Sequence, residues 1–333
     1  MRITATFLAA LALIAHTPLA VHAQPADRLN DASAIRYAWL DGCYAKVRSA
    51  PACGDWILYL RDGGRERLRD AYVRPLDAKG KPLNAITPLA VSDDGRRVAY
   101  FRKGDRRLVV RELGGKVHVI RDEVLVRGYL MRDVAVTLSQ DGTRLAVDYD
   151  DEYDHDRKEK RPTEIYDVAT GTRLGTIPWN FLFSGFSLDG DEVLAKWEDD
   201  EYDTSDVFVF TVQGRQLLHA KSPVKDLVLP YGLAADGRSA ATIDYEDGRE
   251  ILKIHDLVTK KSVMNIRMPR TEGAVDSIAW TGPTKITVHF VLQPEGKPAR
   301  IQVREIDTAT KKIRTSDSYT VAAGGFLYVT RGR

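Results

Sequence analysis

The sequence predicts an all-β protein, a β-propeller assembled from four-stranded blades. A glycine-containing turn recurs with a period near 47 residues, and each period has room for about four short strands. No convincing amphipathic helix pattern follows residue 60. Four strands repeated every 45–50 residues are typical of propeller blades.

The recurring element is a turn followed by a strand, and it is seen in five segments. The segments read VSDDGRRVAYF, LSQDGTRLAVDY, FSLDGDEVLAKW, LAADGRSAATIDY and AWTGPTKITVHF. Their glycines are Gly95, Gly142, Gly190, Gly237 and Gly282, at intervals of 47, 48, 47 and 45 residues. Asp-Gly between an apolar run and an alternating strand indicates a hairpin turn, in which glycine supplies a positive φ.

Each turn-strand element is followed by a polar connection and a second alternating strand. These second strands read LVVREL, TEIYDV, VFVFTV, LKIHDL and IQVREI. A further turn and an extended piece, such as Lys116–Ile120, complete the unit. The pattern therefore accounts for four strands in each blade.

The blade count depends on the two ends of the chain. A weaker unit begins at Gly54 and has no innermost strand of its own, whereas the chain ends in a strand without a blade. We therefore expect six blades over about residues 54–330, closed when Phe326–Thr330 joins the blade that contains Trp56–Leu60. Seven blades remain an alternative if Ala34–Tyr44 contributes strands.

The turn motif also resembles a known repeat. Ser92–Tyr100 is similar to the S-P-D-G-K-x-I-A-F repeat of TolB-type, WD40-like bacterial β-propellers. Ser139–Ala146 and Ser187–Leu194 match it well, Ala234–Ala241 less closely and Trp280–Val288 poorly, and the proline of the pattern is absent throughout. The resemblance implies a propeller and no particular activity, because this fold hosts scaffolds, receptors and enzymes.

The composition is that of a folded globular protein: 44% of the 333 residues are hydrophobic, and the 29% that are charged are nearly balanced in sign. A radial fold accommodates this length as one domain, because each blade adds its own core. The net charge of +2 argues against a nucleic-acid partner, which selects strongly basic faces.

The first 23 residues predict an export signal. An early Arg2 precedes the apolar run Phe7–Ala15, and the stretch ends in Val21–Ala23, a pattern that signal peptidase cleaves. An uncleaved anchor is the alternative, but the apolar run is short for a membrane span. We expect a signal peptide at 1–23, an N-terminal segment at 24–53 and one propeller domain at 54–333. The mature protein is predicted to be secreted or extracytoplasmic, with no membrane span.

The only two cysteines, Cys43 and Cys53, lie ten residues apart. In an exported protein such a pair predicts a disulfide rather than a metal site, which would need two more ligands. Closing this short loop would contribute about 2.5–3 kcal/mol to stability. Two free thiols are the alternative.

No catalytic motif is found in the sequence. The G-x-S-x-G, P-loop, H-E-x-x-H and Rossmann glycine patterns are all absent, so we predict no catalytic residue, cofactor or metal. His155 lies in an acidic stretch and would need metal ligands from other connections. An extracytoplasmic hydrolase or lyase with a site in the central channel remains the alternative function, and a calcium-stabilised structural module is a third.

The pentapeptide DDEYD occurs twice, beginning eight residues after Gly142 and nine residues after Gly190. Both copies are therefore expected to connect the second and third strands of neighbouring blades, where all such connections emerge on one face. Variable loops on a rigid scaffold are where binding sites are usually built. The predicted binding residues are Asp150, Asp151, Glu152, Tyr153, Asp154, Asp199, Asp200, Glu201, Tyr202 and Asp203.

The charge on this face is predicted to be uneven. Asp148–Asp156 and Glu198–Asp206 carry six acids each, Asp244–Glu250 carries four, and Arg102–Arg107 is mostly basic. We predict a non-catalytic binding or scaffold protein that engages a protein or cell-envelope polymer, with a cationic partner fitting the acidic arc. The alternative is that the acids are solvated hairpin tips, because like charges about 6 Å apart in water repel by only ~0.7 kcal/mol.

Overall fold

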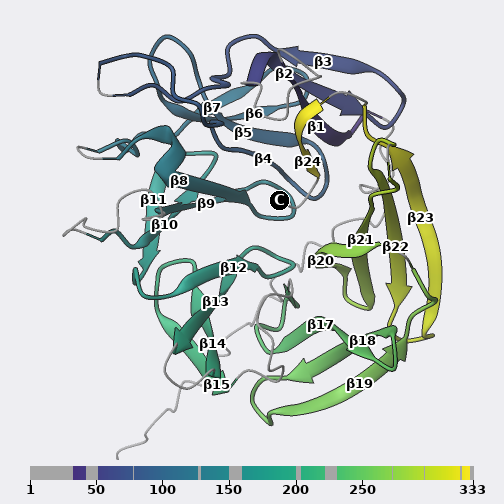
Figure 1. Cartoon of the computed structure of the whole chain (residues 1–333). Helices are drawn as coiled ribbons and strands as arrows, with labels where there is room; N and C mark the ends of the chain where they lie inside the picture. Colours follow the sequence, from purple (N-terminus) through teal and green to yellow (C-terminus); the bar gives the residue numbers. More distant parts are fainter. Residues whose placement is uncertain are drawn as a thin grey trace, which may run out of the picture.

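The chain forms a ring of six four-stranded antiparallel blades around a central axis (Figure 1). The structure is a computed structural model and describes residues 33–42, 52–77, 79–126, 129–149, 160–199, 204–221, 231–271, 273–295, 297–322 and 325–330. The only helical segment in these ranges is the 3-10 turn η2 (Met131–Asp133). The predicted six-bladed all-β propeller is therefore confirmed.

The strands in chain order are β1 (Ile35–Gly42), β2 (Ala52–Leu60), β3 (Arg65–Leu68), β4 (Leu89–Val91), β5 (Arg97–Phe101), β6 (Leu108–Glu112), β7 (Val117–Val119), β8 (Val134–Leu138), β9 (Arg144–Tyr149), β10 (Thr163–Asp167), β11 (Thr172–Ile177), β12 (Leu182–Phe186), β13 (Glu192–Asp199), β14 (Thr204–Thr211), β15 (Gln216–Lys221), β16 (Gly232–Leu233), β17 (Ser239–Glu246), β18 (Arg249–Asp256), β19 (Lys261–Arg267), β20 (Ala274–Gly282), β21 (Lys285–Leu292), β22 (Arg300–Asp307), β23 (Lys312–Thr320) and β24 (Gly325–Thr330). Blade 1 has the order β24-β1-β2-β3. Blades 2 to 6 are β4–β7, β8–β11, β12–β15, β16–β19 and β20–β23.

The hydrophobic core lies between blades rather than in one central mass. Six buried clusters fill the six interfaces: between blades 1 and 2, for example, Trp56 and Leu58 pack with Val98 and Tyr100. Middle strands such as β5 and β10 are consequently buried on both sides, whereas the outermost strand β15 is largely exposed. A ring therefore adds core with every blade and does not need one large central core.

The recurring turn is held by the same hydrogen bonds in successive blades. The Ser92 hydroxyl donates to Asp94 at 2.7 Å and accepts the Arg97 amide at 3.0 Å. Ser139 and Ser187 make equivalent bonds in blades 3 and 4. Because these side chains satisfy the turn backbone locally, the motif appears in the sequence as S-x-D-G.

The turn glycines are needed for their conformation and for close packing. Gly95 has φ 71° and Gly142 has φ 68°, which confirms the predicted positive φ. A Cβ added at Gly95 would lie 2.4 Å from the backbone oxygen of Ile35 in blade 1. The fifth glycine of the pattern, Gly282, ends β20 and is not among the positive-φ residues, in keeping with its poor match to the repeat.

The C-terminal strand closes the ring. β24 is the innermost strand of blade 1 and pairs with β1, with Tyr37 opposite Thr330. Closure is reinforced from blade 6, where Asp317 contacts Arg36 at 3.2 Å, and where the ring of Tyr319 stacks on Tyr37 at 5.4 Å. The prediction that the last strand joins the blade of Trp56–Leu60 is thus confirmed, with β1 lying between them.

The N-terminal part of the propeller differs from the expected boundary. β1 belongs to blade 1, so the ring includes residues that the sequence reading assigned to a separate segment at 24–53. This strand supplies the second position of blade 1 and leaves the count at six. Cys53 lies in β2, and Cys43 lies outside the described residues, so the disulfide stays a prediction. No helix able to cross a membrane occurs in the described part of the chain.

Candidate functional site

The two faces of the ring carry different kinds of loops. Because consecutive strands of a blade are antiparallel, the turns between first and second strands all lie on one face, here called the turn face. The connections between second and third strands lie on the opposite face, here called the connection face. The residues predicted to bind a partner belong to the connection face.

Most of the predicted binding residues lie outside the described residues. The connection between β9 and β10 contains Asp150, Asp151, Glu152, Tyr153 and Asp154, none of which is described. In the connection between β13 and β14, Asp200, Glu201, Tyr202 and Asp203 likewise lie outside. Asp199 is the last residue of β13. The acidic arc therefore stays a prediction, framed by the described residues on either side of it.

The third acidic connection of this face, between β17 and β18, lies within the described residues. Two of its acids form ion pairs with a lysine of the same blade. β17 and β18 are joined by a two-residue turn, in which Asp247 and Gly248 both have positive φ. Lys253 Nζ lies 2.6 Å from a carboxylate oxygen of Asp244 and 2.6 Å from one of Glu246. Hydrogen bonding from Lys253 holds the pKa of Asp244 below its usual range, so this acid is neutralised from within the blade.

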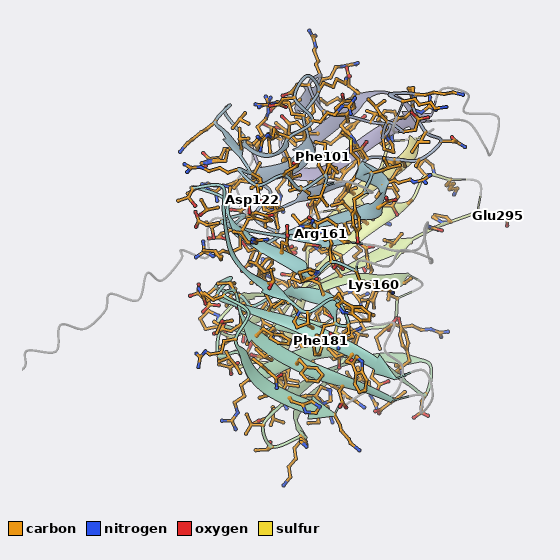
Figure 2. All side chains as sticks on the ribbon, turned by 90° about the vertical axis from the view of Figure 1, so that its left-hand side faces the viewer. Phe101, Asp122, Lys160, Arg161, Phe181 and Glu295 are labelled. Atoms are coloured by element: carbon orange, nitrogen blue, oxygen red, sulfur yellow. The ribbon has the colours of Figure 1, made fainter. Side chains whose placement is uncertain are left out.

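An exposed tryptophan lies beside the first acidic connection. Trp179 is 57% exposed, and the Lys160 ammonium lies over its ring, 5.0 Å from the centroid. Lys160 immediately follows the undescribed residues 150–159. Figure 2 shows Lys160, Arg161 and Phe181 on the edge of the ring that faces the viewer. The indole of Trp179 is therefore available to solvent and already engages a cation.

A second exposed tryptophan lies just before the other acidic connection. Trp197 is 39% exposed. In the β13–β14 pair it lies opposite Asp206, and Ala195, two residues earlier in β13, lies opposite Phe208. Because side chains alternate along a strand, Trp197 lies on the same side of blade 4 as Phe208. The ring of Phe181, two residues after Trp179, packs on Phe208 at 4.6 Å. Interblade packing thus brings both tryptophans to the junction of blades 3 and 4.

A histidine and a carboxylate extend this surface. The ring of His219 is stacked on Phe208 with a centroid distance of 4.3 Å, and its Nε2 lies 2.6 Å from Asp206 Oδ2. The His219 side chain is 49% exposed. We call Trp179, Trp197, Asp206 and His219 the aromatic patch. It combines exposed rings with a carboxylate beside both DDEYD connections.

A buried network anchors the strand that follows the first acidic connection. Glu164 is 2% exposed and accepts hydrogen bonds from Tyr149 (3.1 Å), Tyr166 (2.5 Å) and Arg161 (2.6 Å). Burial acts to raise the pKa of Glu164, but the hydrogen bonds from Tyr166 and Arg161 outweigh it and lower the pKa. The carboxylate is therefore ionised and fully partnered, which fixes the start of β10.

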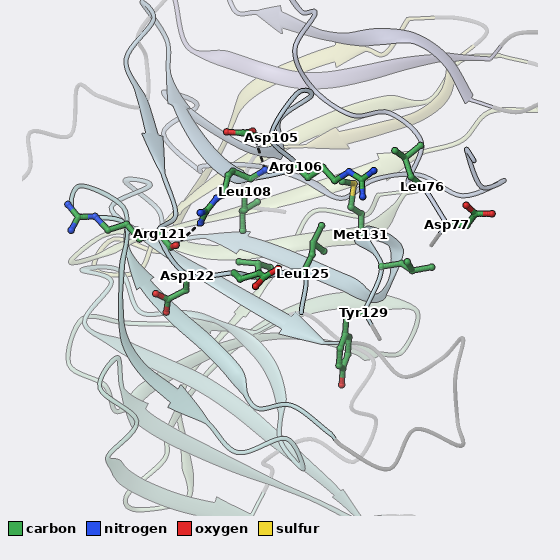
Figure 3. A pocket seen from close by; sticks show the side chains of 14 residues that line it. Leu76, Asp77, Asp105, Arg106, Leu108, Arg121, Asp122, Leu125, Tyr129 and Met131 are labelled. Carbon is green, nitrogen blue, oxygen red and sulfur yellow. Dashed lines mark hydrogen bonds between the residues drawn. The ribbon is translucent and has the colours of Figure 1, made fainter. Parts of the chain in front are cut away.

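The basic sector predicted at Arg102–Arg107 forms the turn between β5 and β6. Arg102 is paired with Asp105, whereas Arg106 and Arg107 line a cavity of about 490 Å³ between blades 2 and 3 (Figure 3). The predicted basic sector therefore lies in blade 2, at the rim of this cavity.

Two small cavities lie at or beside the central channel. One of about 80 Å³ is enclosed by the innermost strands of blades 3 to 6 and their turns, and Asp93 is the only carboxylate that lines it. A second, of about 30 Å³, lies between blades 1 and 6 and includes Asp93, His289 and Glu305. Among the described residues, no group of three or more His, Cys, Asp or Glu side chains is placed to hold a metal ion.

The sequence reading missed the aromatic patch. Trp179 lies between blades and Trp197 lies within a strand, so neither belongs to a recognisable motif. Their positions in the sequence could have indicated the patch. Trp197 is two residues before the second DDEYD copy, and Trp179 follows β11, close to the start of blade 4.

Comparisons with known proteins find similar chains among solved structures. No protein-family model and no curated protein matches the sequence. Among solved structures, TolB from Acinetobacter baumannii is 13% identical with a TM-score of 0.45, over 89% of this chain and 65% of that chain. The β-propeller domain of the Trilobed protease from Pyrococcus furiosus is 12% identical with a TM-score of 0.44, over 87% and 85%.

A hydrazine synthase from Kuenenia stuttgartiensis is 17% identical with a TM-score of 0.40, over 69% of this chain and 65% of that one. The chain thus spans about two thirds of the length of this protein and of TolB. TolB is among the matches. The six-bladed architecture is seen in the chain's own six four-stranded sheets.

Proposed function

We propose that this protein is an extracytoplasmic, non-catalytic binding propeller, which engages a cationic protein or envelope polymer through its connection face. The observation that carries this proposal is the exposure of Trp179 and Trp197 beside the two DDEYD connections. Tryptophan is enriched at the energetic centres of interfaces, and an exposed indole ring attracts cations.

The charge of the two connections supports a cationic partner. Residues 148–156 and 198–206 hold six acids each, and Asp206 lies next to His219 within the aromatic patch. Lysine or arginine side chains of a partner could stack on the indoles, as Lys160 does on Trp179, and pair with the acids around them. The export part of the proposal rests on the sequence of residues 1–23, which lie outside the described residues.

Charge neutralisation tests the proposal. The variant replaces eight acids of the two connections with Asn or Gln: Asp150, Asp151, Glu152, Asp154, Asp199, Asp200, Glu201 and Asp203. A labelled lysine-rich peptide serves as the probe, and its binding to the mature chain is followed by fluorescence anisotropy at several salt concentrations. We expect salt-sensitive binding to the natural chain and its loss in the variant, with the melting temperature changed by only a few degrees.

The matched control replaces Asp244 and Glu246, which lie on the same face but are already paired with Lys253. This change should weaken binding far less than the eight-acid variant does, because it removes only two carboxylates, which already share the charge of Lys253. If the eight-acid variant binds the peptide as well as the natural chain does, the acidic connections are only a solvated surface.

A further inference from the structure

A large cavity lies apart from the aromatic patch, between blades 2 and 3. Its volume is about 490 Å³, within the range of pockets that hold small organic ligands. Three parts of the chain form it: residues 76–77 before β4, the turn 105–108 between β5 and β6, and residues 121–125 and 129–131 between β7 and β8. Figure 3 shows these segments converging around a common hollow.

The floor of this pocket is apolar and rigidly held. Leu108, Val124 and Met131 are almost fully buried. The ring of Tyr129 packs edge-on against Tyr149 at 5.0 Å, and the Tyr149 hydroxyl donates to the Val124 carbonyl at 3.2 Å. The floor is thus preorganised by blade 3, and a ligand would not need to order it.

Three arginines form the cationic part of the rim: Arg106, Arg107 and Arg121. Arg107 is fixed by its hydrogen bond to the Arg121 carbonyl at 2.6 Å. Arg106 has φ 58°, a left-handed conformation that costs a non-glycine residue about 1 kcal/mol. In Figure 3 the Arg106 side chain extends across the pocket toward Met131 and Leu76.

The acids of the rim are largely committed to other partners. Asp105 is paired with Arg102, and Asp77 accepts the backbone amides of Lys79 and Lys81. Asp122 lies 3.8 Å from Arg173. Glu123 is the fourth acid of the lining. Among the described residues, none of the three rim arginines forms an ion pair, so their guanidinium groups can still pair with an anionic ligand.

We propose that this pocket binds an amphiphilic organic carboxylate. Its apolar body would lie on Leu125, Tyr129 and Met131, and its carboxylate would accept hydrogen bonds from Arg106 and Arg107. An arginine suits this role because its planar guanidinium matches the geometry of a carboxylate. The aromatic patch contributes no residue to this site, so the pocket is a second site and does not depend on the proposed cationic partner.

The test is calorimetric titration of the mature chain with decanoate, and with two chain-length-matched ligands, decanol and decyltrimethylammonium. Decanoate should saturate one site with a Kd on the order of 0.1 mM, as expected for a ligand of this size. Decanol should bind at least tenfold more weakly, because it lacks the charge, and decyltrimethylammonium should not bind. Equal affinity for all three ligands, or no binding of decanoate, would overturn the proposal.

Single substitutions test whether decanoate binds in this pocket. Arg106→Ala and Arg107→Ala should each weaken decanoate binding about tenfold or more, since each removes a charge-assisted hydrogen bond. Leu125→Trp should block the pocket while leaving the arginines in place. The control, Arg267→Ala, removes an exposed arginine from the outer strand β19 and should change nothing. Arg106 is a surface side chain, so its variant will fold even if Leu125→Trp does not; unchanged affinity in Arg106→Ala contradicts the proposal.

Discussion

The turn face and the connection face belong to the same ring but use their polar groups differently. On the turn face, Ser92, Asp94 and their counterparts in blades 3 and 4 satisfy the turn backbone, and Arg97 and Arg144 are paired with acids on the third strand of their own blades. On the connection face, loop lengths differ between blades, two tryptophans are exposed, and the acids are concentrated in the connections of blades 3, 4 and 5. One face maintains the repeat, and the other varies from blade to blade.

Breaking the turn face should produce the largest effect. Gly95→Ala should lower the free energy of unfolding by about 3–5 kcal/mol, because a Cβ there meets the Ile35 oxygen at 2.4 Å in a left-handed backbone conformation. The matched control is Gly63→Ala, where φ is 90° but no atom lies within 4 Å of the added Cβ. It should cost only about 1 kcal/mol. Chemical denaturation measures both; equal losses would show that close packing of the turn is unimportant.

On the connection face, the expected effect is on binding rather than folding. Replacing both Trp179 and Trp197 with Ala should weaken binding of the lysine-rich peptide by about thirtyfold or more, as for tryptophans at interface centres. Because both rings are substantially exposed, the melting temperature should change little. Leu217→Ala is the control, since this 44% exposed leucine lies in the outer strand β15. A comparable loss of binding in the control would indicate non-specific hydrophobic attachment.

Glu192 is an exception to the ion pairing of the turn face. It occupies the position of Arg97 and Arg144 at the start of a second strand, but it faces Thr211 instead of an acid. Burial, together with repulsion from Asp189 and Asp191, raises the pKa of Glu192 to about 7. A carboxyl group whose pKa is raised on folding stabilises the fold while protonated, so this contribution is lost as pH rises from about 4.5 to 7.

Glu192→Gln removes this titration. Above pH 7 the variant should be more stable than the natural protein by about 1–2 kcal/mol, after allowance for solvent screening. Below pH 4.5 the advantage should disappear. Denaturant unfolding at pH 4 and pH 8 measures the difference, and a pH-independent difference between the two proteins would contradict the assignment.

The parts of the fold that the sequence predicted are those stabilised by hydrogen bonds between residues close in the chain. The S-x-D-G turn satisfies its own hydrogen bonds within six residues, so its spacing in the sequence reports the blade period directly. The sequence did not place β1 in a blade, because the two strands that pair with it, β24 and β2, come from opposite ends of the chain. The aromatic patch was missed for a similar reason: Trp179 and Trp197 lie in different blades' segments, and only the packing of Phe181 on Phe208 places both at the junction of blades 3 and 4.

The proposed role of the connection face is tested most directly by hydrogen–deuterium exchange of the mature chain with and without the lysine-rich peptide. Slower exchange is predicted for the backbone on either side of the β9–β10 and β13–β14 connections and around Trp179, with no change in the turns at Gly95, Gly142 and Gly190. Protection confined to the turn face or to the strands lining the central channel would contradict the proposed binding face.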